Sequence, residues 1–189
     1  MSVATLLTRV FVHDIEGVEP RIVRLHRPMQ LVGMATDTSL RNVYHDVPEL
    51  GKRFRQYTRT NPVPDKQEPW AFAAVSKGYD GEKGTFRYFM GDVVTSTEHK
   101  PGELSEFEIP AILYAVFQVR PKNRFGWPMA IANTKRYAYD VWLPKSGYQP
   151  AGVIDDFELH DERSARPHDP EVDLYVAIRE RQGGGSPWK

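Results

Sequence analysis

The chain has 189 residues, of which 40% are apolar, so it is long and apolar enough to form one globular domain with its own core. Its 25 basic and 25 acidic side chains give a formal net charge of zero, which predicts no nucleic-acid partner because phosphate contacts need an excess of basic residues. The absence of cysteine excludes disulfides and thiolate chemistry, and no apolar run approaches the ~20 residues of a membrane helix; both fit a cytoplasmic protein without a membrane partner.

The first half of the chain predicts a strand, a helix and two further strands. Residues 22–34 form a largely apolar stretch that Pro28 interrupts, which is typical of an edge or bulged strand. A helix is expected from Asp46, which can cap it, with Pro48 in its first turn and an end before the breaker cluster at 61–64. Strands follow at 70–75 and 86–94, and the glycine-rich segment 79–84 predicts a turn between them.

The second half repeats this order. Residues 107–119 predict one long strand, and a helix opens at Trp127-Pro128 and ends near Pro144. Its apolar stripe is formed by Trp127, Ile131, Ala138 and Trp142. Strands follow at 153–162 and 172–178, the latter with strict alternation.

The repeated order predicts an α+β fold of tandem duplicated β-α-β-β units, with antiparallel sheets, helices on one side and a central ligand cleft. The domain is expected to cover residues 1–181, with halves at about 19–96 and 103–180 and a flexible tail at 182–189.

The last two strands carry the main candidate site. Alternation places Phe157 and Leu159 on one face, and Glu158 on the other with Asp156 and His160. In the final strand, Tyr175 lies opposite the apolar face. We expect both apolar faces to cover the helix that opens at Trp127, so that Glu158 and Tyr175 point together into the groove.

A carboxylate in an aromatic groove has two uses. It can attract a cation, with cation–π contacts that contribute ~0.5–2 kcal/mol, or it can act as a general acid or base. The alternative is a solvent-facing glutamate on a half-exposed antiparallel sheet. Trp70, Tyr114 and Trp142 are the candidates for groove walls, although each aromatic side chain is equally compatible with the core.

No metal or cofactor is predicted. Asp156, Glu158 and His160 are close in sequence to Asp161, but alternation puts Asp161 on the opposite face. No histidine pair has metal-binding spacing, no glycine motif for nucleotide phosphates occurs, and nothing indicates an axial histidine for haem.

Three segments resemble the C-terminal signature of GyrI-like, AraC-type effector-binding domains. They are Val-Trp-Leu-Pro-Lys-Ser-Gly-Tyr at 141–148, Asp-Phe-Glu-Leu-His-Asp-Glu-Arg at 156–163 and the strand at 172–178; residues 109–117 are similar to the strand that opens the family's second half. The resemblance implies a duplicated β-α-β-β fold with a central cleft, in which Glu158 is the cleft acid and Tyr175 the cleft aromatic. His160 stands where the family usually has tyrosine.

Two functions follow from the resemblance. The first is a stand-alone module, monomeric or homodimeric, that binds a small hydrophobic or cationic organic molecule through Glu158, Tyr175, Trp142, Tyr114, Trp70 and His160. The second is a hydrolase of cyclopropane-bearing toxic compounds, with Glu158 as general base. Such an enzyme needs a second polar group to hold water, for which Tyr114, Tyr175 and His160 are the candidates.

Overall fold

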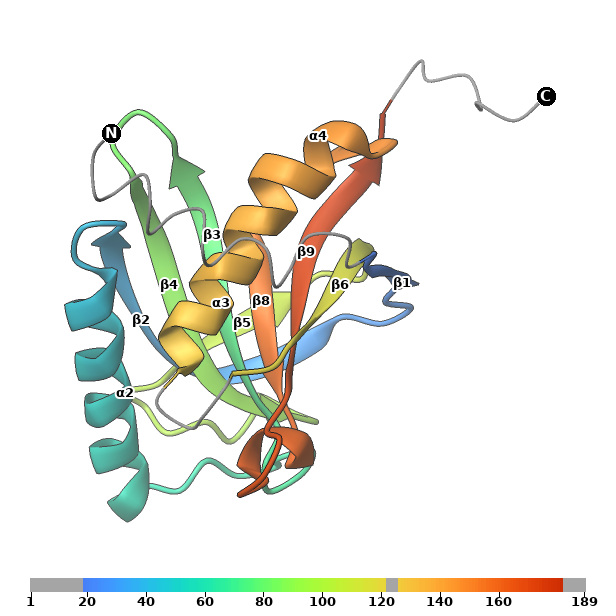
Figure 1. The fold of residues 1–189 in the computed structure, drawn as a ribbon. Coiled ribbons are helices and arrows are strands. Elements are labelled where there is room, and N and C mark those ends of the chain that lie inside the picture. The colour runs from blue at the N-terminus through green and yellow to red at the C-terminus, as the bar shows by residue number, and fades with distance from the viewer. Residues whose placement is uncertain (1–18, 122–125, 182–189) are drawn as a thin grey trace.

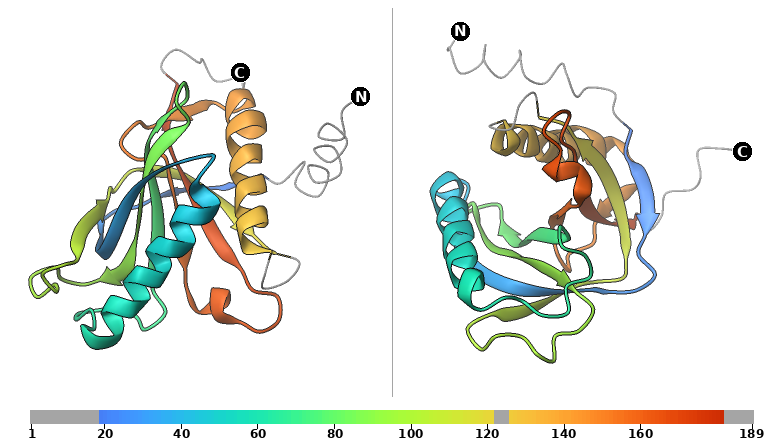
Figure 2. Two further views of the ribbon diagram at one scale, coloured as in Figure 1. Left: turned by 90° about the vertical axis from the view of Figure 1, so that its left-hand side faces the viewer. Right: turned by 90° about the horizontal axis from the view of Figure 1, so that it is seen from below.

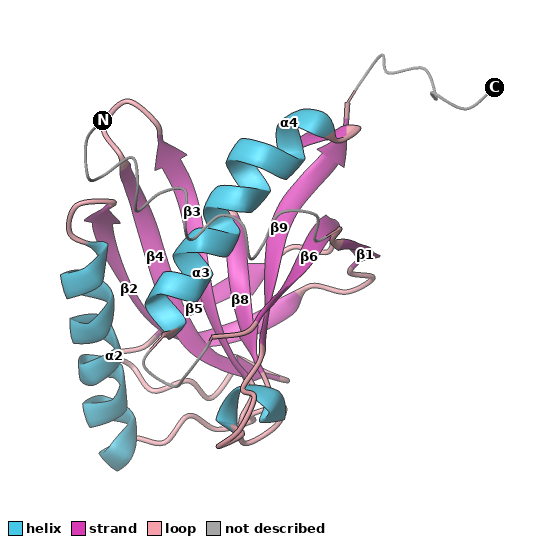
Figure 3. Ribbon diagram, in the orientation of Figure 1, coloured by secondary structure: helices cyan, strands magenta, loops and turns pink. Residues whose placement is uncertain are grey.

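The protein is built on one curved antiparallel sheet with helices against one of its faces (Figures 1 and 3). The computed structural model describes residues 19–121 and 126–181. The strands within these ranges are β1 (Arg21–Arg24), β2 (Met29–Ser39), β3 (Phe72–Asp80), β4 (Thr85–Val94), β5 (Ser105–Ile109), β6 (Leu113–Val119), β7 (Tyr148–Pro150), β8 (Asp156–His160) and β9 (Val172–Glu180). The helices are α2 (Val43–Thr60), α3 (Trp127–Arg136), the π-helix η1 (Tyr137–Trp142), α4 (Leu143–Lys145) and the 3-10 helix η2 (Glu162–Ala165).

The strand order confirms the predicted duplication. The sheet runs β1-β6-β9-β8-β3-β4-β2-β5, with β7 paired to β9. The units β2-α2-β3-β4 and β6-α3-β8-β9 therefore occupy mirrored places in the order. They meet where β3 pairs with β8, so the halves form one continuous sheet instead of two separate small ones. The tail expected at 182–189 lies outside the described residues.

Two of the predicted strands are each split, and the pieces pair with different halves. The strand expected at 22–34 divides into β1 and β2, and the strand expected at 107–119 divides into β5 and β6. β1 pairs with β6 of the second unit, whereas β5 pairs with β2 of the first. The breaks fall at Pro28 and Pro110, because proline lacks the amide that would continue a ladder. We call this arrangement the strand exchange.

The connections of the strand exchange run side by side. The amide of Leu25, after β1, donates to the carbonyl of Ile112, before β6, at 3.0 Å. The second half of the sheet is thus completed by β1, which precedes the first half in sequence. The first half is completed by β5, which precedes the second half.

Both faces of the sheet are buried. On the helix-bearing face, α2 packs through Leu50 and Phe54, and α3 with η1 packs on β6 and β9. On the opposite face, Val23 of β1 and Ile109 of β5 pack in the same apolar cluster as Phe157 of central β8. End strands and a centre strand can share a cluster only because the sheet curves, which Figure 2 shows from two further sides.

Helix α2 begins earlier than predicted. It starts at Val43, so Asp46 lies inside the helix and does not cap it. The Asp46 carboxylate instead accepts a hydrogen bond from Thr38 Oγ1 at 2.7 Å, and this bond lowers the pKa of Asp46. The predicted end before residue 61 is confirmed, as is the turn before β4, where Gly84 has a φ of 65°.

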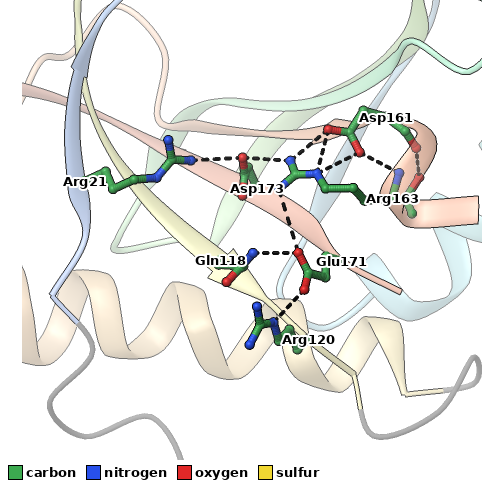
Figure 4. A network of polar contacts seen from close by, with 8 residues as sticks. Arg21, Gln118, Arg120, Asp161, Arg163, Glu171 and Asp173 are labelled. Carbon is green, nitrogen blue, oxygen red and sulfur yellow. Dashed lines mark hydrogen bonds and ion pairs between the residues drawn. The ribbon is translucent and has the colours of Figure 1, made fainter. Parts of the chain in front are cut away.

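A polar network attaches β1 to the second half (Figure 4). The buried Asp173 of β9 accepts from Arg21 at 3.1 Å and from Arg163 of η2 at 2.9 Å. Arg163 also binds Asp161 at 2.8 Å, so one carboxylate holds the exchanged strand and the η2 segment together. No helix among the described residues is both long and apolar enough to cross a bilayer.

Candidate functional site

Three cross-strand pairs lie between α2 and α3 on the helix-bearing face. They join β3 to β8 and consist of Phe72 with His160, Ala74 with Glu158, and Ser76 with Asp156. We call these six residues the inter-helix strip. The intervening residues of both strands, including Val75 and Phe157, point to the cluster on the opposite face.

One end of the strip is an ion cluster. Lys135, in the last turn of α3, places Nζ 2.8 Å from Asp156 Oδ1 and 3.0 Å from Glu158 Oε1. The same ammonium donates to Ser76 Oγ at 3.3 Å. The two acidic side chains are only 4% and 6% exposed, so the cluster pairs two buried carboxylates with one ammonium.

The ammonium of Lys135 is held in its charged form. Burial lowers the pKa of Lys135, but the charges of Asp156 and Glu158 outweigh that effect and raise it overall. Lys135 is therefore charged throughout the neutral pH range and is not a neutral, nucleophilic lysine.

Two tyrosine hydroxyls flank the cluster. Tyr139 lies in η1, a π-helical segment of the kind that often occurs at functional sites, and donates to Asp156 Oδ2 at 3.0 Å. Tyr88 of β4 pairs with Ser76 and is buried next to the cluster. Burial, then the charge of Glu158, raises the pKa of Tyr88, and burial with the charge of Asp156 raises that of Tyr139. Both phenols stay neutral.

The other end of the strip is aromatic. The His160 ring lies 5.7 Å from the ring of Phe72 and 6.2 Å from that of Trp127 at the start of α3. Phe72 in turn lies 6.1 Å from Phe54 of α2. These four rings form an aromatic row that crosses the strip from one helix to the other.

Burial lowers the pKa of His160, despite the opposing charges of Glu158 and Asp161. The unfolded chain binds a proton near pH 6.5, the folded chain only at lower pH, so stability falls as pH drops below about 6.5. We expect His160→Phe to reduce this slope, which for one group is at most about 1.4 kcal/mol per pH unit. Urea unfolding between about pH 5 and 7 measures it, with the exposed His26→Phe as control. An unaltered slope in the His160 variant would contradict the assignment.

Two of the predicted site residues, Glu158 and His160, lie in the strip. They are on the face of β8 that carries the helices, whereas the prediction placed them on the other face. Phe157, expected to face the helix, stacks on Tyr175 with ring centroids 4.4 Å apart, on the opposite side of the sheet. The prediction that Tyr175 shares a face with Glu158 is therefore wrong; Glu158 pairs with Leu174. The predicted contact of the apolar face of β9 with the second helix is confirmed.

The remaining predicted residues lie elsewhere. Tyr114 is fully buried on the face opposite the strip and donates to the Pro110 carbonyl at 2.8 Å. Trp142 packs edge-on against Phe117 at 5.5 Å. Trp70 lies in the turn before β3 and is 44% exposed.

Lys135 is the important residue that the sequence reasoning missed. It follows Trp127 and Ile131 at helical spacing, so it falls on the apolar stripe of its own helix. A charged residue in that position is the signal that could have identified it, because a buried lysine needs carboxylate partners.

The duplicated β-α-β-β fold that carries this strip belongs to the GyrI-like class of effector-binding domains. More particularly, the chain belongs to the family of the integron-associated effector binding protein Cass2, whose model matches residues 21–178.

Similar proteins agree with this membership. The transcriptional regulator BrlR of Pseudomonas aeruginosa is 33% identical over 135 residues, which are 69% of this chain and 45% of BrlR, so the chain spans less than half of that relative. The structure of SAV2435 bound to tetraphenylphosphonium matches with a TM-score of 0.66 at 12% identity, covering 86% of this chain and 94% of SAV2435. An integron cassette protein of Vibrio cholerae matches with a TM-score of 0.59 at 13% identity, covering 85% and 96%.

Proposed function

We propose that this protein binds a small organic cation with an aromatic body on the inter-helix strip. The observation that carries the proposal is Glu158: its side chain is 6% exposed, and Lys135 holds only Oε1. Within the described ranges, the only ion pair of Glu158 is this one, and no hydrogen bond is made to Oε2. A buried carboxylate that has one oxygen without a partner in these ranges, beside a row of aromatic rings, is suited to a cationic ligand.

The aromatic row supplies the second half of the recognition. Trp127 and Phe72 present ring faces or edges on either side of His160, whose lowered pKa keeps it uncharged at neutral pH. A cation over such rings gains about 0.5–2 kcal/mol, more where water is excluded. The relative SAV2435, with its bound tetraphenylphosphonium, supports a ligand of this chemical kind.

Tetraphenylphosphonium is therefore the first probe, measured by titration calorimetry and by quenching of Trp127 fluorescence. We expect Glu158→Gln, which keeps the shape and removes the charge, to weaken its binding at least tenfold, or about 1.4 kcal/mol. Triphenylphosphine oxide, a neutral molecule with similar rings, should bind both proteins equally. The exposed Glu106→Gln is the matched control. Equal cation affinity in wild type and Glu158→Gln would refute the proposal.

The geometry favours binding over turnover. The hydrolase alternative requires Glu158 and a second polar group around one water molecule. Two of the three candidates for that group, Tyr114 and Tyr175, lie on the opposite face of the sheet from Glu158, and the Tyr114 hydroxyl is bound to the Pro110 carbonyl. The absence of a nucleic-acid partner and the monomeric or dimeric state stay predictions from sequence.

A further inference from the structure

We infer that Lys135 makes the inter-helix strip selective for ligands with one positive charge over ligands with two. The inference rests on the proposed function and adds the charge of the ligand that the site accepts.

Three of the four carboxylate oxygens of the ion cluster already have a partner. Asp156 gives Oδ1 to Lys135 and Oδ2 to the Tyr139 hydroxyl. Glu158 gives Oε1 to Lys135. Oε2 of Glu158 forms no hydrogen bond or ion pair with another residue in the part of the chain that the structure describes. One carboxylate oxygen of the cluster is thus left without a partner among the described residues and can receive a ligand.

The formal charge of the cluster also indicates that the site accepts one positive charge. Two carboxylates and one ammonium leave a formal charge of −1. Tyr88 and Tyr139 stay neutral. Asp155 accepts a bond from the Tyr79 amide at 2.9 Å and, among the described contacts, forms no ion pair with Lys135, so it is not a member of the cluster. One positive charge on a ligand completes the balance. A second one would be buried without a partner, which is strongly unfavourable.

A lysine with a merely structural role would act differently. Its loss would change the folded fraction, or weaken every ligand by a similar factor. It would leave unchanged the ratio between the affinities of two ligands that share a ring system and differ in charge. That ratio is therefore the measurement that isolates charge selection by Lys135.

Ethidium and propidium are suitable probes, because they share one phenanthridinium ring system and carry one and two positive charges. We expect wild type to bind ethidium more tightly. Lys135→Gln takes the cluster to a formal charge of −2, and the propidium-to-ethidium affinity ratio should rise at least tenfold. The double variant Lys135→Gln, Asp156→Asn restores a formal charge of −1. Its propidium-to-ethidium affinity ratio should therefore lie within about threefold of the wild-type ratio. Lys52→Gln, on the exposed surface of α2, should leave the ratio unchanged.

If Lys135→Gln does not fold, the comparison moves to the Asp156→Asn background. There Lys135→Gln changes the formal charge from zero to −1, and the ratio must again rise tenfold. A ratio that does not respond, while ethidium binding still depends on Glu158, overturns the inference and leaves the proposed function standing. Failure of wild type to bind either dye or tetraphenylphosphonium overturns the proposed function itself.

Discussion

Lys135→Met should lower the free energy of unfolding by about 3–5 kcal/mol, because it leaves two buried carboxylates without their cation. The folded-state pKa of Lys135 is raised above its unfolded value of about 10.4, so its stabilising contribution is complete below that pH and is lost only as pH rises through the folded pKa. The loss in the variant should therefore be constant between about pH 6 and 9. Urea denaturation at several pH values measures it.

The control for Lys135→Met is Lys52→Met on α2, where the lysine and Glu49 are both more than half exposed and 3.9 Å apart. An exposed pair of this kind contributes about 1 kcal/mol or less. Adding Asp156→Asn to Lys135→Met removes one of the two uncompensated charges and should recover part of the loss. A Lys135→Met protein as stable as the Lys52 variant would show that the ion cluster does not stabilise the fold.

Gly33→Ala should destabilise the protein by about 3 kcal/mol or more, the upper range for overpacking a closely packed sheet. Gly33 of β2 stands opposite Gly91 of β4. A Cβ atom on Gly33 would lie 1.9 Å from the Met90 carbonyl oxygen and 2.5 Å from Gly91 Cα, both in the backbone, so a strand would have to move. Thermal unfolding of the variant measures the effect.

Gly102→Ala is the matched control, because an added Cβ there meets no atom within 4 Å. Its melting temperature should stay close to that of wild type. Equal melting temperatures for Gly33→Ala and Gly102→Ala would contradict the close approach of β2 and β4 at Gly33.

The element order could be predicted from sequence, because capping residues, breakers and alternation are local signals. Residues 61–64 end α2 and Gly84 closes the β3–β4 turn where the pattern indicated. Which strands pair with each other in the sheet could not be predicted from these local signals. Pro28 and Pro110 mark breaks, but nothing local says that the chain crosses to the other half at each of them.

The orientation of Glu158 shows a second limit of prediction from sequence. The prediction assigned Phe157 to the helix because it is apolar, which is sound for a sheet with one solvated face. Here the curved sheet buries both faces, so apolarity does not distinguish them. The register between β3 and β8, and the reach of Lys135 from α3, are tertiary facts that no single strand encodes.

The strand exchange has a consequence for how the chain folds during its synthesis. Residues 21–24 pair with residues 113–116, which leave the ribosome roughly 5–20 s later at usual elongation rates of about 5–20 residues per second. Until then β1 is an unpaired strand, and for most of that interval the nascent first half also lacks β5. Arg21 and Arg24 bracket its two apolar residues, and charges so placed on an unpaired strand discourage association with other chains. The same arginine that later binds Asp173 thus acts first as a gatekeeper.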